Sequence, residues 1–199
     1  MTPKIANRTG LQPWFEQLQS SDPAERVTAA SQLGRLGVRS RWPNITRGSF
    51  FIAAPNRLSP EQTALLLDAL AGPHPDLRRE VAFALGEWAG EEAIPPLSER
   101  ATGDPDLQTR IAAARALARI GGRQAVMTLR TLARHAPHED VRAAAIEGLG
   151  TLAAASIVGE EDKTTEVAGL LRLLDEIRKA DASQYVRILA DGTLSRLAA

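Results

Sequence analysis

The sequence contains no cysteine, carries no net charge and has no long apolar run. The lack of cysteine excludes disulfides, zinc–thiolate sites, iron–sulfur clusters and thiol catalysis. Its 24 basic and 24 acidic residues cancel, so the chain as a whole has no bulk attraction to nucleic acid or to an anionic membrane. Stretches such as 152–158 fall far short of the roughly 20 apolar residues that span a bilayer. The first ten residues also lack the apolar segment of a secretory signal. We therefore expect a soluble, cytoplasmic protein with no membrane partner.

What the sequence does contain is a repeated arginine motif. Five times an arginine is followed seven residues later by leucine and eight residues later by a small residue: Arg26/Leu33/Gly34, Arg78/Leu85/Gly86, Arg110/Leu117/Ala118, Arg142/Leu149/Gly150 and Arg187/Leu194/Ser195. The arginines at 78, 110 and 142 lie 32 residues apart, which is the length of one helical hairpin. This period predicts an all-α fold, an α-solenoid wound as a right-handed superhelix of about five hairpins, with one continuous core and a single domain over residues 1–199.

The residues around each arginine predict where the helices lie. Apolar or small residues follow each arginine at +3, +4 and +7, which is one stripe of a helix, so each arginine begins the second helix of a hairpin. Asp191 alone breaks the +4 position and marks the last repeat as an end cap. Trp88 aligns with apolar residues of the other repeats and is predicted to be core. The first helices are expected at 12–19, 59–70, 94–100, 124–133 and 164–179.

The repeated arginines are interpreted mainly as structural, with ligand contact as the alternative. Asp22 precedes Arg26 by four residues, while Asp104 and Asp181 precede the next arginines by six. A turn carboxylate at this spacing can pair with a guanidinium group, and such pairs suit a partly buried seam between repeats. We therefore predict a ladder of charges between hairpins.

Two segments carry a resemblance to a known family. Residues 74–97 (HPDLRREVAFALGEWAGEEAIPPL) and 104–121 (DPDLQTRIAAARALARIG) resemble the short HEAT repeats first recognised in phycobilin lyases. The resemblance extends over the chain except for two insertions, and it implies a HEAT-like solenoid. The shared residues are packing residues, so the resemblance speaks to fold and only weakly to function.

Two insertions interrupt the repeat spacing and are candidates for function. Arg26 and Arg78 are 52 residues apart, which places an insertion at about 38–58, and Arg142 and Arg187 are 45 apart, which places a second at about 156–166. The first insertion interleaves basic and aromatic residues, among them Arg39, Arg41 and Trp42. This pattern favours contact with an acidic protein surface, a phosphate or a nucleic-acid backbone. The alternative is that its aromatic residues pack under the first hairpin. The second insertion is acidic and is expected to be a solvated connector.

The concave face of the solenoid is the other predicted binding surface. Second helices line this face, and residues one, two, five and nine positions after the arginine lie outside the core stripe. Phe83 is unusual in these positions: either it is an exposed anchor or its helix is rotated by one position. The predicted groove therefore mixes acidic, basic and aromatic residues, and its members are Arg79, Glu80, Phe83, Glu87, Arg115, Arg119, Glu147 and Thr151.

No catalytic residue, metal ligand or cofactor is predicted. Deoxyhypusine hydroxylases are HEAT-repeat enzymes that hold two irons through His-Glu dyads directly after the repeat arginine, and none of the five corresponding dipeptides here is His-Glu. His138-Glu139 precedes Arg142, and a single such pair cannot form a dinuclear site. The sequence also lacks a glycine-rich phosphate loop and a nucleophile elbow.

The leading hypothesis is a non-catalytic scaffold that binds another protein through its concave face and the first insertion. A first alternative is a phycobilin lyase-like or other tetrapyrrole-binding HEAT protein, in which Arg115 and Arg119, one turn apart, would hold propionates. A second is a nucleic-acid-binding HEAT protein, but the mixed charge of the groove argues against a nucleic-acid partner.

Overall fold

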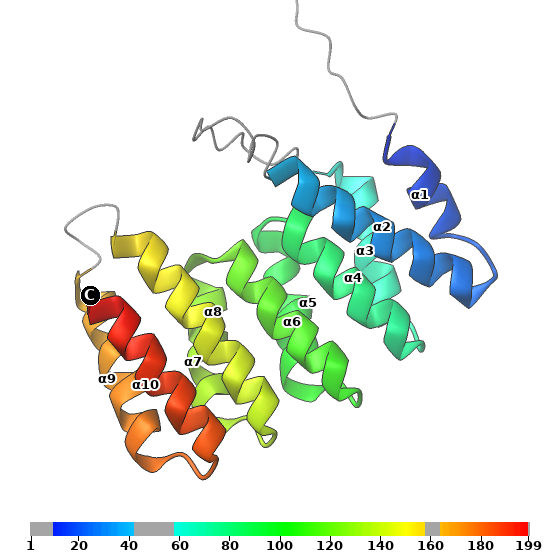
Figure 1. The fold of residues 1–199 in the computed structure, drawn as a ribbon. Coiled ribbons are helices and arrows are strands. Elements are labelled where there is room, and N and C mark those ends of the chain that lie inside the picture. Colours follow the sequence, from blue (N-terminus) through cyan, green and yellow to red (C-terminus); the bar gives the residue numbers. More distant parts are fainter. Residues whose placement is uncertain (1–9, 42–57, 158–163, 199) are drawn as a thin grey trace, which may run out of the picture.

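The computed structural model describes residues 10–41, 58–157 and 164–198, which form α-helices joined by short turns and contain no strand (Figure 1). The described helices are α1 (Gln12–Gln17), α2 (Pro23–Arg41), α3 (Pro60–Ala71), α4 (Pro75–Trp88), α5 (Ile94–Gly103), α6 (Leu107–Ile120), α7 (Gly122–His135), α8 (Glu139–Ile157), α9 (Thr164–Ala180) and α10 (Gln184–Ala198), with a short 3-10 helix at Glu91–Ala93. Consecutive helices contact each other as five hairpins. The predicted all-α solenoid is confirmed, and its first helices begin within two residues of their predicted positions.

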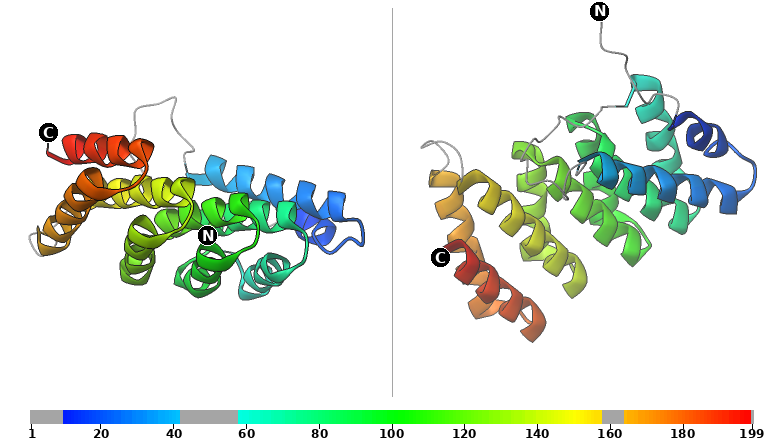
Figure 2. Two further views of the ribbon diagram at one scale, coloured as in Figure 1. Left: turned by 90° about the horizontal axis from the view of Figure 1, so that it is seen from below. Right: turned by 45° about the horizontal axis from the view of Figure 1, so that its top comes forward.

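The hairpins stack so that their helices form two layers (Figures 1 and 2). The second helices α2, α4, α6, α8 and α10 pack side by side and contact one another extensively, whereas the first helices contact one another much less. A layer in which the helices lie closer together is the inner layer of a curved stack. This arrangement supports the prediction that the second helices line the concave side.

Small residues allow the second helices to approach so closely. A Cβ added to Gly86 on α4 would lie 2.8 Å from the Cα of Ala116 on α6. A Cβ added to Gly150 on α8 would lie 2.7 Å from a methyl carbon of Thr193 on α10. Real Cβ atoms do not approach other atoms so closely, so Gly86 and Gly150, each eight positions after a repeat arginine, set the spacing between these helices.

The core residues lie where the sequence predicts them. Ala113, Ala114 and Leu117 of the apolar stripe on α6 are fully buried. Trp88 is 5% exposed, and its indole Nε1 donates a hydrogen bond to the carbonyl of Leu33 on α2 at 2.7 Å. Asp191 is exposed on α10 and lies 3.6 Å from Arg178, as expected for the solvent face of a terminal repeat.

Local signals in the sequence fix the ends of several helices. Ser59 and Gln62 form a capping box at the start of α3, with the side chain of each accepting a hydrogen bond from the main-chain N–H of the other. The connection from α6 to α7 is made by Gly121 and Gly122, whose φ angles of 74° and 83° favour glycine. These tight connections leave little freedom in how one helix follows the next.

The structure describes the insertions only in part. Helix α2 continues through residues 38–41, the first four of the predicted first insertion, and residues 42–57 lie outside the described part of the chain. At the second insertion α8 ends at Ile157 and α9 begins at Thr164, and the residues between them are likewise not described. No helix in the described ranges combines the length and apolar character that a membrane crossing needs.

Two of the repeated arginines form ion pairs that connect neighbouring hairpins, one of them buried and the other partly buried. Arg78 on α4 donates from Nε and Nη2 to the two carboxylate oxygens of Asp104, in the turn after α5, at 2.8 and 2.7 Å. Arg142 on α8 forms the same bidentate pair with Asp181, in the turn after α9, with both distances 2.8 Å. In each case Nη1 donates to two main-chain carbonyls in the turn of the arginine's own hairpin. Each arginine therefore ties its own hairpin to the next one.

The aspartates of the ladder pair with other arginines than the sequence predicts. Asp104 and Asp181 pair with the arginine of the preceding hairpin, and not with Arg110 and Arg187, which follow them by six residues. The physical reason is that the turn of each hairpin lies against the second helix of the hairpin before it.

The predicted pairing of Asp22 with Arg26 was wrong. The carboxylate of Asp22 accepts the N–H of Ala24 at 2.9 Å, and Arg26 Nε donates to the carbonyl of Leu18 at 3.1 Å. Asp22 lies directly before α2, and its carboxylate binds a main-chain N–H of the first turn, so it does not reach the Arg26 guanidinium group.

The ion pairs shift the pKa values of both aspartates. Burial by itself would raise the pKa of Asp104, but hydrogen bonds from Arg78 and from the N–H of Asp106, with the charges of Arg78 and Arg100, hold the pKa below its ordinary value. Burial likewise opposes ionisation of Asp181, and bonds from Arg142 and the N–H of Ser183 lower its pKa in the same way. Both carboxylates are therefore ionised in the folded protein well into the acid range.

We expect the ladder to make stability pH-dependent in acid. A carboxyl whose folded pKa is lowered stabilises the protein above its unfolded pKa of about 3.9, and that contribution is lost as pH falls through the folded value. Unfolding by urea at a series of pH values should therefore show the wild type losing stability below about pH 4. In Asp104→Asn the loss should be shallower. Equal pH dependence in the two proteins would contradict the role given to Asp104.

Gly86→Ala should destabilise the protein although alanine is the better helix former. The added methyl must push α6 away from α4, at a cost of about 1–3 kcal/mol that exceeds the gain of about 1 kcal/mol in helix propensity. Gly103→Ala is the matched control, because a Cβ at Gly103 meets nothing within 4 Å. Chemical denaturation of both variants checks this, and a Gly86→Ala protein as stable as Gly103→Ala would show that the layer can widen freely.

Candidate functional site

Half of the residues predicted on the concave face lie together at a hollow between α4 and α6. The hollow has a volume of about 240 Å³. Four of the predicted residues, Arg79, Phe83, Arg115 and Arg119, line it. We call this feature the α4–α6 hollow; its other lining residues are Gln108, Ile111, Ala112 and Ala116.

The floor of the α4–α6 hollow is apolar, and Phe83 forms part of it. Phe83 is half-buried, and its ring lies over Gly34 of α2, where an added Cβ would come within 2.4 Å of the ring. Val81 and Leu85 on the same helix are fully buried, as the predicted register requires. Helix α4 is therefore not rotated. Phe83 can sit where it does because the neighbouring helix has a glycine at the point of contact.

Three guanidinium groups surround this apolar floor, and two of them form ion pairs with carboxylates of α4. Arg79 lies 3.0 Å from Asp76 and 3.5 Å from Glu80, both on its own helix. Arg119 forms an ion pair with Glu87, and its guanidinium carbon lies 5.4 Å from the centre of the Phe83 ring. These contacts hold the two side chains in place and neutralise much of their charge.

Arg115 is the most accessible cation of the hollow. Its side chain is 63% exposed, against 41% for Arg119 and 38% for Arg79. Its nearest carboxylate is Glu147 on α8, at 3.8 Å, and that side chain is itself 46% exposed. An exposed ion pair of this length contributes little to stability, about 0–1 kcal/mol. Arg115 can therefore turn to another carboxylate at little cost.

Glu87 was wrongly predicted to face the groove. It is 2% exposed and lies beneath Arg119, facing α2 where Gly37 has no side chain. The prediction followed the position of Glu87 on its own helix, whereas its burial depends on a glycine in a different hairpin. Glu80 and Glu147 lie beside Arg79 and Arg115 respectively but do not line the α4–α6 hollow, so their place in a binding groove stays a prediction.

The predicted contact residues of the first insertion lie outside the part of the structure in which side chains are described. Arg39 and Arg41 belong to the last turn of α2, and their side chains lie outside the described part of the structure, as does Trp42. Their role stays a prediction.

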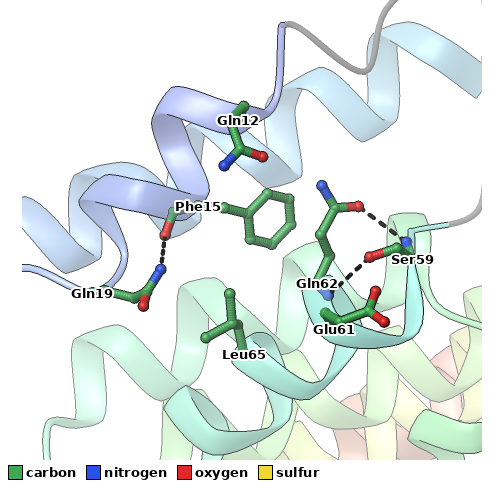
Figure 3. A pocket seen from close by; sticks show the side chains of 7 residues that line it. All are labelled: Gln12, Phe15, Gln19, Ser59, Glu61, Gln62 and Leu65. Carbon is green, nitrogen blue, oxygen red and sulfur yellow. Dashed lines mark hydrogen bonds between the residues drawn. The ribbon is translucent and has the colours of Figure 1, made fainter.

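A second hollow, of about 300 Å³, lies between α1 and α3 and was not predicted from the sequence. Figure 3 shows the Phe15 ring and Leu65 facing each other across it, with Gln12, Gln19 and Gln62 at its edges. Its amides are engaged locally: Gln19 donates to the carbonyl of Phe15, and Gln62 belongs to the capping box (Figure 3). No sequence pattern marks this hollow, because it results from how α1 meets a helix more than forty residues later.

The histidines of the described chain belong to no larger cluster of potential metal ligands. No group of three or more histidine, aspartate or glutamate side chains there is arranged to hold a metal ion. His135 is exposed, and His138 lies in the turn before α8, where its Nδ1 accepts the N–H of Asp140 at 3.3 Å.

Comparison with known proteins identifies the repeat. Residues 63–150 match the family of HEAT repeats. The search of curated proteins found no match to the sequence. Among solved structures, the complex of CpcE and CpcF of phycocyanin lyase from Nostoc sp. PCC7120 is similar, with a TM-score of 0.61 at 18% identity over 94% of this chain and 99% of that one. A designed armadillo repeat protein in complex with the peptide (KR)4 has a TM-score of 0.58 at 17% identity, over 95% of this chain and 82% of that one. At these identities the two comparisons show a likeness of fold alone between this chain and each of the two structures.

Proposed function

From the match of residues 63–150 to HEAT repeats, we propose that the chain is a non-catalytic scaffold that binds a segment of a partner protein in the α4–α6 hollow. One observation carries the proposal. Three guanidinium groups surround an apolar floor on the inner helix layer, and one of them, Arg115, is mostly exposed and forms a long, exposed ion pair with Glu147.

The chemistry of the hollow defines the segment that would fit it. An apolar side chain would contact Phe83, Ile111 and Ala112 on the floor, and a carboxylate nearby would replace Glu147 as the partner of Arg115. Aromatic and arginine side chains are the residues that most often dominate binding energy at protein interfaces. We therefore expect an acidic segment with an apolar anchor.

The fold supports a peptide partner. The designed armadillo protein whose fold this chain shares is in complex with a basic peptide, (KR)4. The most accessible charged side chain of the α4–α6 hollow, Arg115, is positive like that peptide, so the segment that complements the hollow is acidic and not basic. Arg39, Arg41 and Trp42 of the first insertion are proposed as a second contact for the same partner.

For the tetrapyrrole alternative, the structure offers one accessible guanidinium group where the sequence predicts two. Arg119 is already paired with Glu87, so Arg115 alone would be accessible to a propionate. Mixing the protein with a linear tetrapyrrole and recording the absorption spectrum tests this alternative. An altered spectrum that Arg115→Glu abolishes would favour it over the scaffold. For the nucleic-acid alternative, a mobility shift at low salt that disappears as salt rises would be the equivalent sign.

The proposal predicts that a photo-crosslinking amino acid at Gln108 captures a partner protein. Gln108 is exposed and lines the hollow, whereas Gln124 is exposed on α7 in the outer layer and serves as the control position. A band seen from Gln108 and not from Gln124 should weaken when Arg115→Glu is added. Reversing a central charge that pairs with the partner should weaken binding roughly 10- to 30-fold.

Arg123→Glu is the matched charge reversal, since Arg123 is exposed at the start of α7, away from the hollow. It should leave the Gln108 band unchanged, and melting temperatures of both variants show that each is folded. A Gln108 band that survives Arg115→Glu, or the lack of any band specific to Gln108, would overturn the proposal.

A further inference from the structure

The chain contains two copies of the same carboxylate-binding arrangement. At Asp104 the carboxylate accepts from Arg78 Nε and Nη2 and from the main-chain N–H of Asp106, the last at 2.9 Å. At Asp181 it accepts from Arg142 Nε and Nη2 and from the N–H of Ser183, the last at 2.8 Å. A guanidinium fork from one hairpin and an N–H from the turn of the next thus form a three-donor site in both places.

A third position of the same kind has the donors but no aspartate. The repeat spacing places Ala136 where its neighbours have Asp104 and Asp181, since each lies six residues before a repeat arginine. The arginine that should meet it is Arg110 on α6. Among the described residues Arg110 Nε is buried and has no hydrogen-bond partner. A buried N–H without an acceptor is costly, which is why such groups are rare in folded proteins.

The turn donor of this third position is also without an acceptor. The N–H of His138 lies two residues after Ala136, as those of Asp106 and Ser183 lie two residues after their aspartates. Within the described chain no hydrogen bond from the His138 N–H is found. The methyl group of Ala136 cannot accept it.

A cavity lies where the missing carboxylate would be. It has a volume of about 90 Å³ and is lined by Arg110 and Ala136, together with Thr102, Thr131 and His135. A single water needs roughly 10–15 Å³ of such space, so the cavity has room for a carboxylate group. Its lining contains no acidic side chain. Thr102, Thr131 and His135 are exposed, so the cavity can be reached from solvent.

We propose that this cavity between α5, α6, α7 and α8 binds a carboxylate supplied from outside the chain, either as a small carboxylate ion or as the acidic side chain of a partner. The bound group would take the place that Asp104 and Asp181 have in the other two sites. It would accept from the Arg110 fork and from the N–H of His138. The site is distinct from the α4–α6 hollow and does not rest on the function proposed for it.

The test is an NMR titration that follows the arginine Nε–H resonances. Sodium acetate is added at constant ionic strength, with sodium chloride as the parallel titration. The Arg110 signal should move in a saturable way, in the millimolar range, towards the positions of the Arg78 and Arg142 signals. Those two signals should stay still, because both groups already have a carboxylate.

Two variants and a second ligand sharpen the test. Ala136→Asp supplies the carboxylate within the chain, so the Arg110 signal should be shifted without acetate and should no longer respond to it. Ala136→Asn fills the same space without a charge, so it should abolish the response and leave the Arg110 signal closer to its wild-type position. Arg115→Glu, which alters only the α4–α6 hollow, should leave the response intact.

The second ligand is N-acetyl-aspartic acid amide, whose one carboxylate is an aspartate side chain. Binding at least as tight as that of acetate would identify the acidic side chain of a protein as the occupant, and binding of acetate alone would identify a small ion. A chloride titration that moves the Arg110 signal equally, or no saturable movement with either carboxylate, would overturn the proposal.

Discussion

An ion pair between the second helix of one hairpin and the turn of the next fixes two of the four junctions in the stack, at α4 and at α8. The side chain of Asp104 is fully buried and that of Arg78 is 6% exposed. Removing both groups from water is expensive, and the bidentate geometry with additional bonds to main-chain groups repays that cost only while both partners are present. The pair therefore acts less as a source of net stability than as a lock: a hairpin that shifts by one turn would leave a buried charge unpaired.

The candidate site follows from the spacing that these locks and the small residues set. Gly86 and Ala116 bring α4 and α6 close together, so side chains at the next positions along the same helices share a single hollow. Gly34 makes room for the Phe83 ring, and that ring supports Arg119. The same repeat position also explains the cavity beside Arg110. Ala136 stands where the neighbouring repeats have Asp104 and Asp181, so the Arg110 guanidinium group faces a cavity and not a carboxylate.

The sequence predicted the features that depend on residues close together along the chain, and it did not predict those that depend on contacts between hairpins. The hairpins, the core stripe on α6 and the grouping of Arg79, Phe83, Arg115 and Arg119 depend on helical periodicity and a fixed repeat, which are visible along the chain. The burial of Glu87 could not be predicted, because it depends on Gly37 in another hairpin. The direction of the ladder also depends on how the turn of one hairpin meets the preceding one. The hollow between α1 and α3 had no signal in the sequence.

A double-mutant cycle on Arg78 and Asp104 tests the central claim most directly. Urea unfolding of the wild type, Arg78→Ala, Asp104→Ala and the double variant gives the coupling energy of the pair. If the pair is the lock described above, each single variant loses about 3–5 kcal/mol and the double variant loses little more than either, so the coupling is at least about 2 kcal/mol. Losses that simply add, with a coupling below about 0.5 kcal/mol, would contradict it.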